Sequence, residues 1–246
     1  MPETTTAALA EEILAELRAQ ANPDNVAGMA RYGIASENTL GVSIPTLRAI
    51  AKRVRPRRRS DPGYLHELAA ALWASGVHEA RILAGFVDVP ALVTREQMEA
   101  WALDFDSWDV TDQVTDLFAQ TPLARELAVA WAACDETFVK RSGFVIMCAL
   151  AHKGSKVADD DLLEFLPLIE REATDGRNFV KKAVNWALRQ IGKRSAALNA
   201  AAIASGERIL AQHADSTAAR WVARDALREL RSDAVRDRLG IGQRDV

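Results

Sequence analysis

Residues 107–112 read SWDVTD and place an indole and a carboxylate four positions apart. On a helix, Trp108 and Asp112 would lie on one face, one turn from each other. An indole face attracts positive charge, and a nearby carboxylate adds a stronger Coulomb attraction where water is excluded. We therefore expect this segment to bind a cation, or to stabilise one that forms during a reaction.

A second segment combines an indole with cations. Residues 181–189 read KKAVNWALR, and helical spacing places Lys182, Trp186 and Arg189 on one face. The stretch 177–194 holds six cations and no acid. Such a surface can bind a polyanion although the net charge of the chain is −3; the alternative is an ordinary solvated helix face. The basic run at 52–59, KRVRPRRR, is expected to be a helix end followed by a loop, and its role stays open.

Composition is that of a globular protein. Of the 246 residues, 49% are hydrophobic and 26% are charged, which argues against disorder. The two cysteines lack metal-ligand spacing and fit a reducing compartment. The N-terminus does not read as a signal peptide, and no apolar run approaches the ~20 residues that span a bilayer. We expect a cytoplasmic monomer that does not enter membranes and that, if its polyanion is DNA, lies with the nucleoid when bound.

Helical periodicity extends along the whole chain, without a clear alternating strand pattern. The connections are short, so one domain over residues 1–246 is expected. Helix starts are predicted at Asn22, Ser43, Thr94, Thr121 and Ser216, and helix breaks near Gly33, Gly76, Gly154, Gly176, Gly192 and Gly206.

A weak internal repeat accompanies this periodicity. Residues 138–141, FVKR, recur 41 positions later as FVKK, and residues 187–191, ALRQI, recur 39 positions later as ALREL. A period near 40 is typical of HEAT-type helix pairs. The prediction is an all-α, right-handed α-solenoid of antiparallel helix pairs with a concave binding face. Residues from about 1 to 60 fit the period poorly and are expected to form a capping segment on the substrate side.

The residue types exclude most catalytic classes. No nucleophilic triad or Gly-rich phosphate loop is visible, and the four histidines lack metal-ligand spacing, so neither a metal nor a cofactor is expected. Carboxylate, indole and cationic side chains suit one reaction well. A purine alkylated at N3 or N7 carries a positive charge, so its glycosidic bond is already activated. One aspartate among aromatic rings can then stabilise an oxocarbenium-like sugar and position a water.

The chain resembles the AlkD-like DNA alkylation repair glycosylases, a family built from HEAT-like repeats. The resemblance runs from about residue 20 to 195. It rests on NP at 22–23 followed by MARY at 29–32, on LGVSIP at 40–45, on SWDVTD at 107–112, on FVKR at 138–141 and on FVKKAVNW at 179–186.

This resemblance implies a glycosylase that acts on duplex DNA from the backbone side, without a deep base pocket. It implies that Asp112 is catalytic, that Trp108 faces the deoxyribose of the lesion, and that Trp186 is a second indole of the site. Arg141 would clamp the DNA backbone. Some relatives carry two consecutive tryptophans where this chain has Ser107-Trp108, which leaves the substrate preference open.

Several alternatives stay open at this stage. Asp109 and Asp116 are rivals of Asp112 on the same helix, and Asp112 could instead pair with Arg141 or Lys182 in a structural bridge. Tyr32, beside Arg31, is a candidate DNA contact or a core residue. We expect Lys181, Lys182, Arg189 and Arg141 to bind phosphates, and Trp73, Trp101, Trp131 and Trp221 to pack in the core or between helices. A non-catalytic HEAT-like DNA-binding protein and a protein-binding scaffold are the alternative functions.

Overall fold

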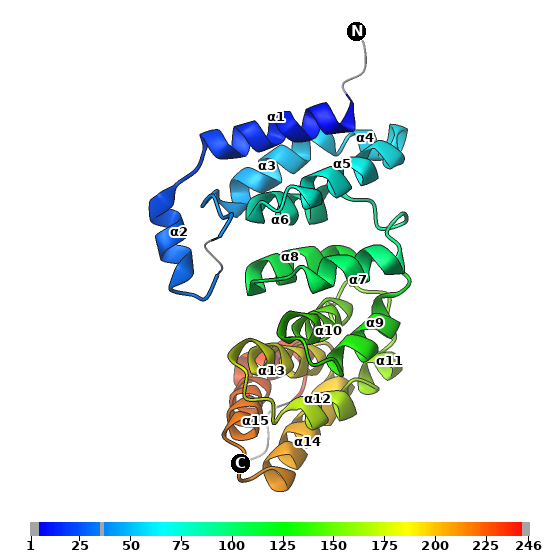
Figure 1. The fold of residues 1–246 in the computed structure, drawn as a ribbon. Helices are drawn as coiled ribbons and strands as arrows, with labels where there is room; N and C mark the ends of the chain where they lie inside the picture. The colour runs from blue at the N-terminus through cyan, green and yellow to red at the C-terminus, as the bar shows by residue number, and fades with distance from the viewer. Residues whose placement is uncertain (1–4, 35–36, 243–246) are drawn as a thin grey trace. The chain divides into compact units, whose positions relative to one another are not determined.

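The computed structural model describes residues 5–34 and 37–242, apart from the side chain of residue 58. Within these ranges the chain is helical and contains no strand, which confirms the all-α prediction (Figure 1). The helices are α1 (Thr6–Ala19), α2 (Pro23–Ala30), α3 (Ile44–Val54), α4 (Arg57–Ser60), α5 (Pro62–Ala74), α6 (His78–Val87), α7 (Arg95–Leu103), α8 (Trp108–Phe118), α9 (Ala124–Ala132), α10 (Thr137–Leu150), α11 (Asp159–Leu163), α12 (Leu166–Glu172), α13 (Asn178–Gly192), α14 (Ala196–Gln212), α15 (Thr217–Leu230) and α16 (Asp233–Leu239).

The chain forms two compact units, Met1–Leu123 and Ala124–Val246. In the first unit α1 packs against α5, α3 packs against α6, and α6 packs against α8. In the second unit α9 pairs with α10 and α14 pairs with α15, while α13 packs against both α10 and α15. Helices of successive pairs thus contact their counterparts within each unit, as in HEAT-like repeats. Three further features stay predictions: a single domain with a cap at about residues 1–60, a right-handed twist of the solenoid, and a concave binding face.

The repeat seen in the sequence corresponds to neighbouring helices. The rings of Phe138 on α10 and Phe179 on α13 lie 5.6 Å apart between centroids. On the other side of α13, the amide of Asn185 donates to the carbonyl of Val222 on α15, at 2.9 Å. The repeat therefore reflects equivalent positions on α10, α13 and α15.

Most helix starts lie where the sequence predicts them, because a side-chain oxygen caps the first turn. The helices α2, α3, α7 and α15 are capped by Asn22, Ser43, Thr94 and Ser216. The start predicted at Thr121 is wrong. Its hydroxyl donates to the carbonyl of Phe118 at 2.8 Å, at the end of α8, and the next helix begins only at Ala124.

Two further corrections concern breaks and loops. Gly206 lies inside α14, where a Cβ would be 3.0 Å from the side chain of Leu227, so its small size allows α15 to approach. The second half of the 52–59 run forms the short helix α4 and not a loop. The guanidinium of Arg57 lies 4.3 Å from the ring centroid of Tyr64, and Arg53 pairs with Glu16 of α1 at 2.9 Å.

Of the four tryptophans expected to pack in the core or between helices, three are buried. Trp73 and Trp101 stack at 4.1 Å between ring centroids, and Trp131 is also buried. Trp221 is the exception, since it is 39% exposed. It precedes the buried pair Val222 and Ala223 on α15 and so lies on the outer side of that helix. Of the helices described, none has the length and apolar character to cross a bilayer.

Candidate active site and nucleic-acid interface

The helix α8 begins at Trp108, so the indole stands at the first position of the helix that carries Asp112. The indole N–H donates to the carbonyl oxygen of Tyr32 at 3.0 Å, which joins α8 to the end of α2. Trp108 is half-buried, whereas Tyr32 is 74% exposed. Tyr32 is therefore not a core residue, and its ring is accessible to a ligand.

Asp109 is held by a buried histidine of the neighbouring helix. Nε2 of His78, on α6, lies 2.9 Å from Oδ2 of Asp109, and the hydroxyl of Ser107 donates to Oδ1 at 2.9 Å. Burial favours the neutral imidazole, yet the hydrogen bond and charge of Asp109 raise the pKa of His78. Burial likewise opposes ionisation of Asp109, but His78 holds the pKa of this carboxyl below its usual value. Asp109 is thus held by two side-chain hydrogen bonds, and its rivalry with Asp112 stays open.

A second buried acid fixes the loop between α2 and α3. The carboxylate of Glu79 is 1% exposed, and it accepts hydrogen bonds from the backbone N–H groups of Leu40, Gly41 and Val42 at 2.6–3.2 Å. The side-chain amide of Asn25, on α2, donates to the carbonyl of Gly41 at 2.9 Å. No residue of α2 is itself buried, so these bonds and the one from Trp108 to Tyr32 help to position the helix.

These contacts border a cavity of about 650 Å³ in the first unit. Its walls are mostly apolar, and they come from α2, the loop before α3, and the helices α6 and α8. The sequence did not predict this cavity. Its lining includes Met29, Tyr32, Ile44, His78, Trp108 and Gln113.

Asp116 has other neighbours. With Arg48 of α3 and Arg55, the residue after that helix, it lines a separate, polar cavity of about 310 Å³. Partial burial raises the pKa of Asp116, and the charge of Arg48 opposes this rise. Asp112 is half-buried on α8, and it is not part of the lining of either cavity. Its place one turn after the anchored Trp108 is what distinguishes it from Asp109 and Asp116.

The other predicted site residues belong to the second unit, and their convergence with Trp108 and Asp112 stays a prediction. Arg141 is 6% exposed on α10, and its Nη1 donates to the carbonyl of Phe179 at 2.7 Å. That carbonyl belongs to the first turn of α13. Trp186 is half-buried on the same helix, one turn after the exposed Lys182.

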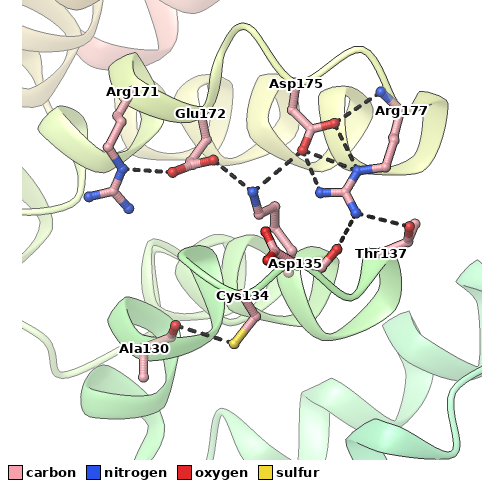
Figure 2. Close-up of polar contacts among 9 residues, drawn as sticks. Ala130, Cys134, Asp135, Thr137, Arg171, Glu172, Asp175 and Arg177 are labelled. Atoms are coloured by element: carbon pink, nitrogen blue, oxygen red, sulfur yellow. Dashed lines mark hydrogen bonds and ion pairs between the residues drawn. The ribbon is translucent and has the colours of Figure 1, made fainter.

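Four of the six cations between 177 and 194 are compensated by acids from other parts of the unit. Figure 2 shows Arg177, whose guanidinium binds Asp175 at 2.6 Å and also contacts Thr137 and the backbone of Asp135. Burial opposes ionisation of Asp175, yet hydrogen bonds from Arg177 lower the pKa of this carboxyl. Lys140 adds a second cation beside it, at 3.5 Å.

The remaining compensated cations lie toward the end of α13. Arg189 bridges Asp225 and Glu229 of α15 at 3.4 and 3.0 Å. Lys193 pairs with Glu229 at 2.6 Å, and Arg194 pairs with Asp159 at 2.9 Å. In the described residues no ion pair is found for Lys181 or Lys182. Of the six cations that the sequence places between 177 and 194, only these two lysines are therefore without an ion pair in the described residues.

Comparison with known families agrees with this combination of fold and residues. The family model described as DNA alkylation repair enzyme matches residues 13–230. The chain belongs to this family. The region that matches the family model extends over both units and includes α8 and α13. No curated protein matches the chain.

One solved structure shares the fold of this DNA alkylation repair family member. It is described as one of "a new family of proteins related to the HEAT-like repeat DNA glycosylases with affinity for branched DNA structures". The two chains are 18% identical, with a TM-score of 0.73, and the alignment covers 96% of this chain and 98% of the other. The HEAT-like repeat fold is thereby confirmed.

Sequence reasoning missed the residues that hold the site together. His78 and Glu79 lie on α6, far along the chain from Asp109 and from the loop at 40–42, so local spacing gave no signal of these pairs. Throughout the described residues, no group of three or more His, Cys, Asp or Glu side chains could hold a metal ion. That the reaction needs no metal or cofactor stays a prediction.

Proposed function

We propose that this protein is a monofunctional DNA glycosylase that removes positively charged N3- and N7-alkylpurines from duplex DNA. One observation carries the proposal: a member of the DNA alkylation repair enzyme family has Trp108 anchored at the start of α8 and Asp112 one turn later. The carboxylate and indole provide what a departing cationic purine requires, which is stabilisation of positive charge on the sugar.

The reaction is hydrolysis of the N-glycosidic bond. As the bond between C1′ and the purine nitrogen breaks, its electron pair moves to the purine and neutralises the alkylated ring. Positive charge then develops on the deoxyribose, where the carboxylate of Asp112 stabilises it and orients a water. The water oxygen bonds to C1′ and releases a proton to solvent. No general acid is needed, because the leaving purine is already cationic.

In the second unit, basic residues would bind the DNA backbone. Lys182 is exposed, Lys181 lies one residue before it, and Trp186 follows one turn later as the second indole of the proposed site. Arg141, on α10, would act through its guanidinium, which lies beside the first turn of α13. Arg189 is a smaller contributor than Lys182 in this proposal, because Asp225 and Glu229 already compensate its charge. Tyr32 is exposed enough to contact the lesion strand.

A DNA-binding protein without glycosylase activity is the second candidate. The observation in its favour is the fold shared with a protein whose family is described by its affinity for branched DNA. In that case the protein would bind branched or damaged DNA and leave the glycosidic bond intact.

The deciding assay is release of free purine from duplex DNA that contains N7-methylguanine or N3-methyladenine, with undamaged duplex as the control. The glycosylase proposal expects free methylated purine and an abasic site in the DNA, with no strand cleavage by the protein itself. Binding of the same duplexes without any release of purine would favour the second candidate.

A further inference from the structure

Trp221 on α15 is an exposed aromatic residue that the proposed glycosylase site does not use. It is 39% exposed, whereas Trp73, Trp101 and Trp131 are each at most 6% exposed. Leaving a large indole in water forgoes the free energy that its burial would supply. An exposed tryptophan therefore needs an explanation of its own.

The surroundings of Trp221 are cationic. Nζ of Lys181, on α13, lies 5.3 Å from the centroid of the Trp221 ring. Arg224 follows Trp221 by three positions, so both side chains leave α15 on the same side, and Arg224 is exposed. Among the residues that the structure describes, Arg224 has no ion-pair partner.

The charges of α13 and α15 together do not balance. The two helices carry six cations and two carboxylates, a surplus of four positive charges. Both carboxylates, Asp225 and Glu229, already contact arginines. An exposed ring in a region with surplus positive charge has the composition of a surface that stacks a base and binds the adjoining phosphates.

We propose that Trp221, with Lys181 and Arg224, forms a binding platform for unpaired nucleotides of single-stranded DNA. The indole would stack on one base, and the two cations would contact phosphates on either side of it. Unpaired nucleotides are the favoured occupant because the bases of an intact duplex are already stacked on one another and offer no ring face to the indole. A protein partner would gain less here, because an ordinary protein surface does not neutralise four surplus charges. The inference goes beyond the proposed glycosylase activity, since it involves neither Asp112 nor the lesion.

The test is fluorescence anisotropy of the full-length protein with labelled oligothymidine of about 20 nucleotides and with a blunt, undamaged duplex of the same length. Trp221→Ala should weaken binding of the single strand by about 5- to 100-fold, since stacking on one aromatic residue has this effect on alanine substitution. Trp221→Phe should retain most of the affinity. Binding of the duplex should change by less than about twofold, and so should release of methylated purine from alkylated duplex.

Leu163→Ala is the matched control, because Leu163 in the same unit is also 39% exposed but lies on α11. It should leave single-strand binding unchanged. Equal affinities of Trp221→Ala and Leu163→Ala for oligothymidine would overturn the proposal. An equal loss for single strand and duplex would also overturn it, and would make Trp221 a duplex contact. Loss of self-association in sedimentation, with single-strand binding intact, would assign the ring to contact with a second copy. Each of these results is independent of whether the wild-type protein releases purine.

Discussion

At the scale of single residues, His78 determines how the start of α8 is held. The His78–Asp109 pair lies directly beside Trp108, and Ser107 contributes a second hydrogen bond to the same carboxylate. The charged groups that act on His78 are Asp109, Glu79 and Asp106, and all three raise its pKa against the opposing effect of burial. A histidine whose pKa is raised on folding stabilises the folded state most at pH values below its ordinary pKa. This contribution is lost as the pH rises through the raised, folded-state value.

We expect His78→Gln to lower the free energy of unfolding by about 1–3 kcal/mol near pH 6, because it removes a charge-assisted bond to the half-buried carboxylate of Asp109. The difference from wild type should shrink between pH 6 and pH 9, as His78 loses its proton in the wild-type protein. The lowered pKa of Asp109 affects stability only at acid pH. There the free energy of unfolding falls as the pH drops through the folded-state pKa of Asp109.

Urea denaturation from acid pH up to pH 9 measures both effects. Ser107→Ala is the control, because it removes the other bond to Asp109 without removing a titrating group. The loss in free energy of unfolding caused by Ser107→Ala should be constant from pH 6 to pH 9. A His78→Gln deficit that stays constant or grows over that range would contradict the assignment of a charged His78.

At the scale of elements, a tight turn at Gly41 helps to position α2. Gly41 has φ of +78°, and a Cβ there would lie 2.3 Å from the carbonyl oxygen of Asn22. The turn presents three backbone N–H groups to Glu79 and one carbonyl to Asn25, so its conformation fixes both α2 and one wall of the cavity.

Gly41→Ala should therefore cost more than a left-handed backbone alone, which is about 1–2 kcal/mol. Gly76→Ala provides that reference, since Gly76 has φ of +68° but, among the described atoms, nothing within 4 Å of the added Cβ. Gly28→Ala, in the middle of α2, should be neutral or stabilise by up to about 1 kcal/mol. Thermal denaturation of the three variants should rank Gly41→Ala as the least stable. Equal costs at Gly41 and Gly76 would show that the contact with Asn22 is not important.

At the scale of the whole molecule, the distribution of compensated and uncompensated cations predicts how DNA binding depends on salt. Neutralising phosphates releases counterions, so the logarithm of the affinity falls linearly with the logarithm of the salt concentration. Lys182→Ala should reduce the slope by about one, equally for alkylated and undamaged duplexes, since phosphate contacts read no bases. Arg189→Ala should change the slope less, because Asp225 and Glu229 compensate that charge. Equal changes in the two variants would contradict the proposed role of Lys182.

The positions and caps of helices could be predicted from the sequence, whereas contacts between residues of different helices could not. The helix that carries Trp108 and Asp112 follows from side chains four positions apart, and the Asn22 and Ser43 caps follow from residue type. Pairing of Asp109 with His78 joins two helices, so no local pattern indicates it. The expected basic surface was too large for the same reason, because the acids that compensate Arg189 come from another helix.

The central claim is that Asp112, and not another aspartate of α8, stabilises the charge that forms during base release. The most direct test is the single-turnover rate of N7-methylguanine release from duplex DNA by Asp112→Asn, with Asp116→Asn as the matched variant on the same helix. We expect Asp112→Asn to be slower than wild type by at least about 100-fold, or about 2.7 kcal/mol of barrier, with DNA affinity little changed. Asp116→Asn should retain a rate within a few-fold of wild type. Release by Asp112→Asn at the wild-type rate, or a loss at Asp116 as large as that at Asp112, would contradict the claim.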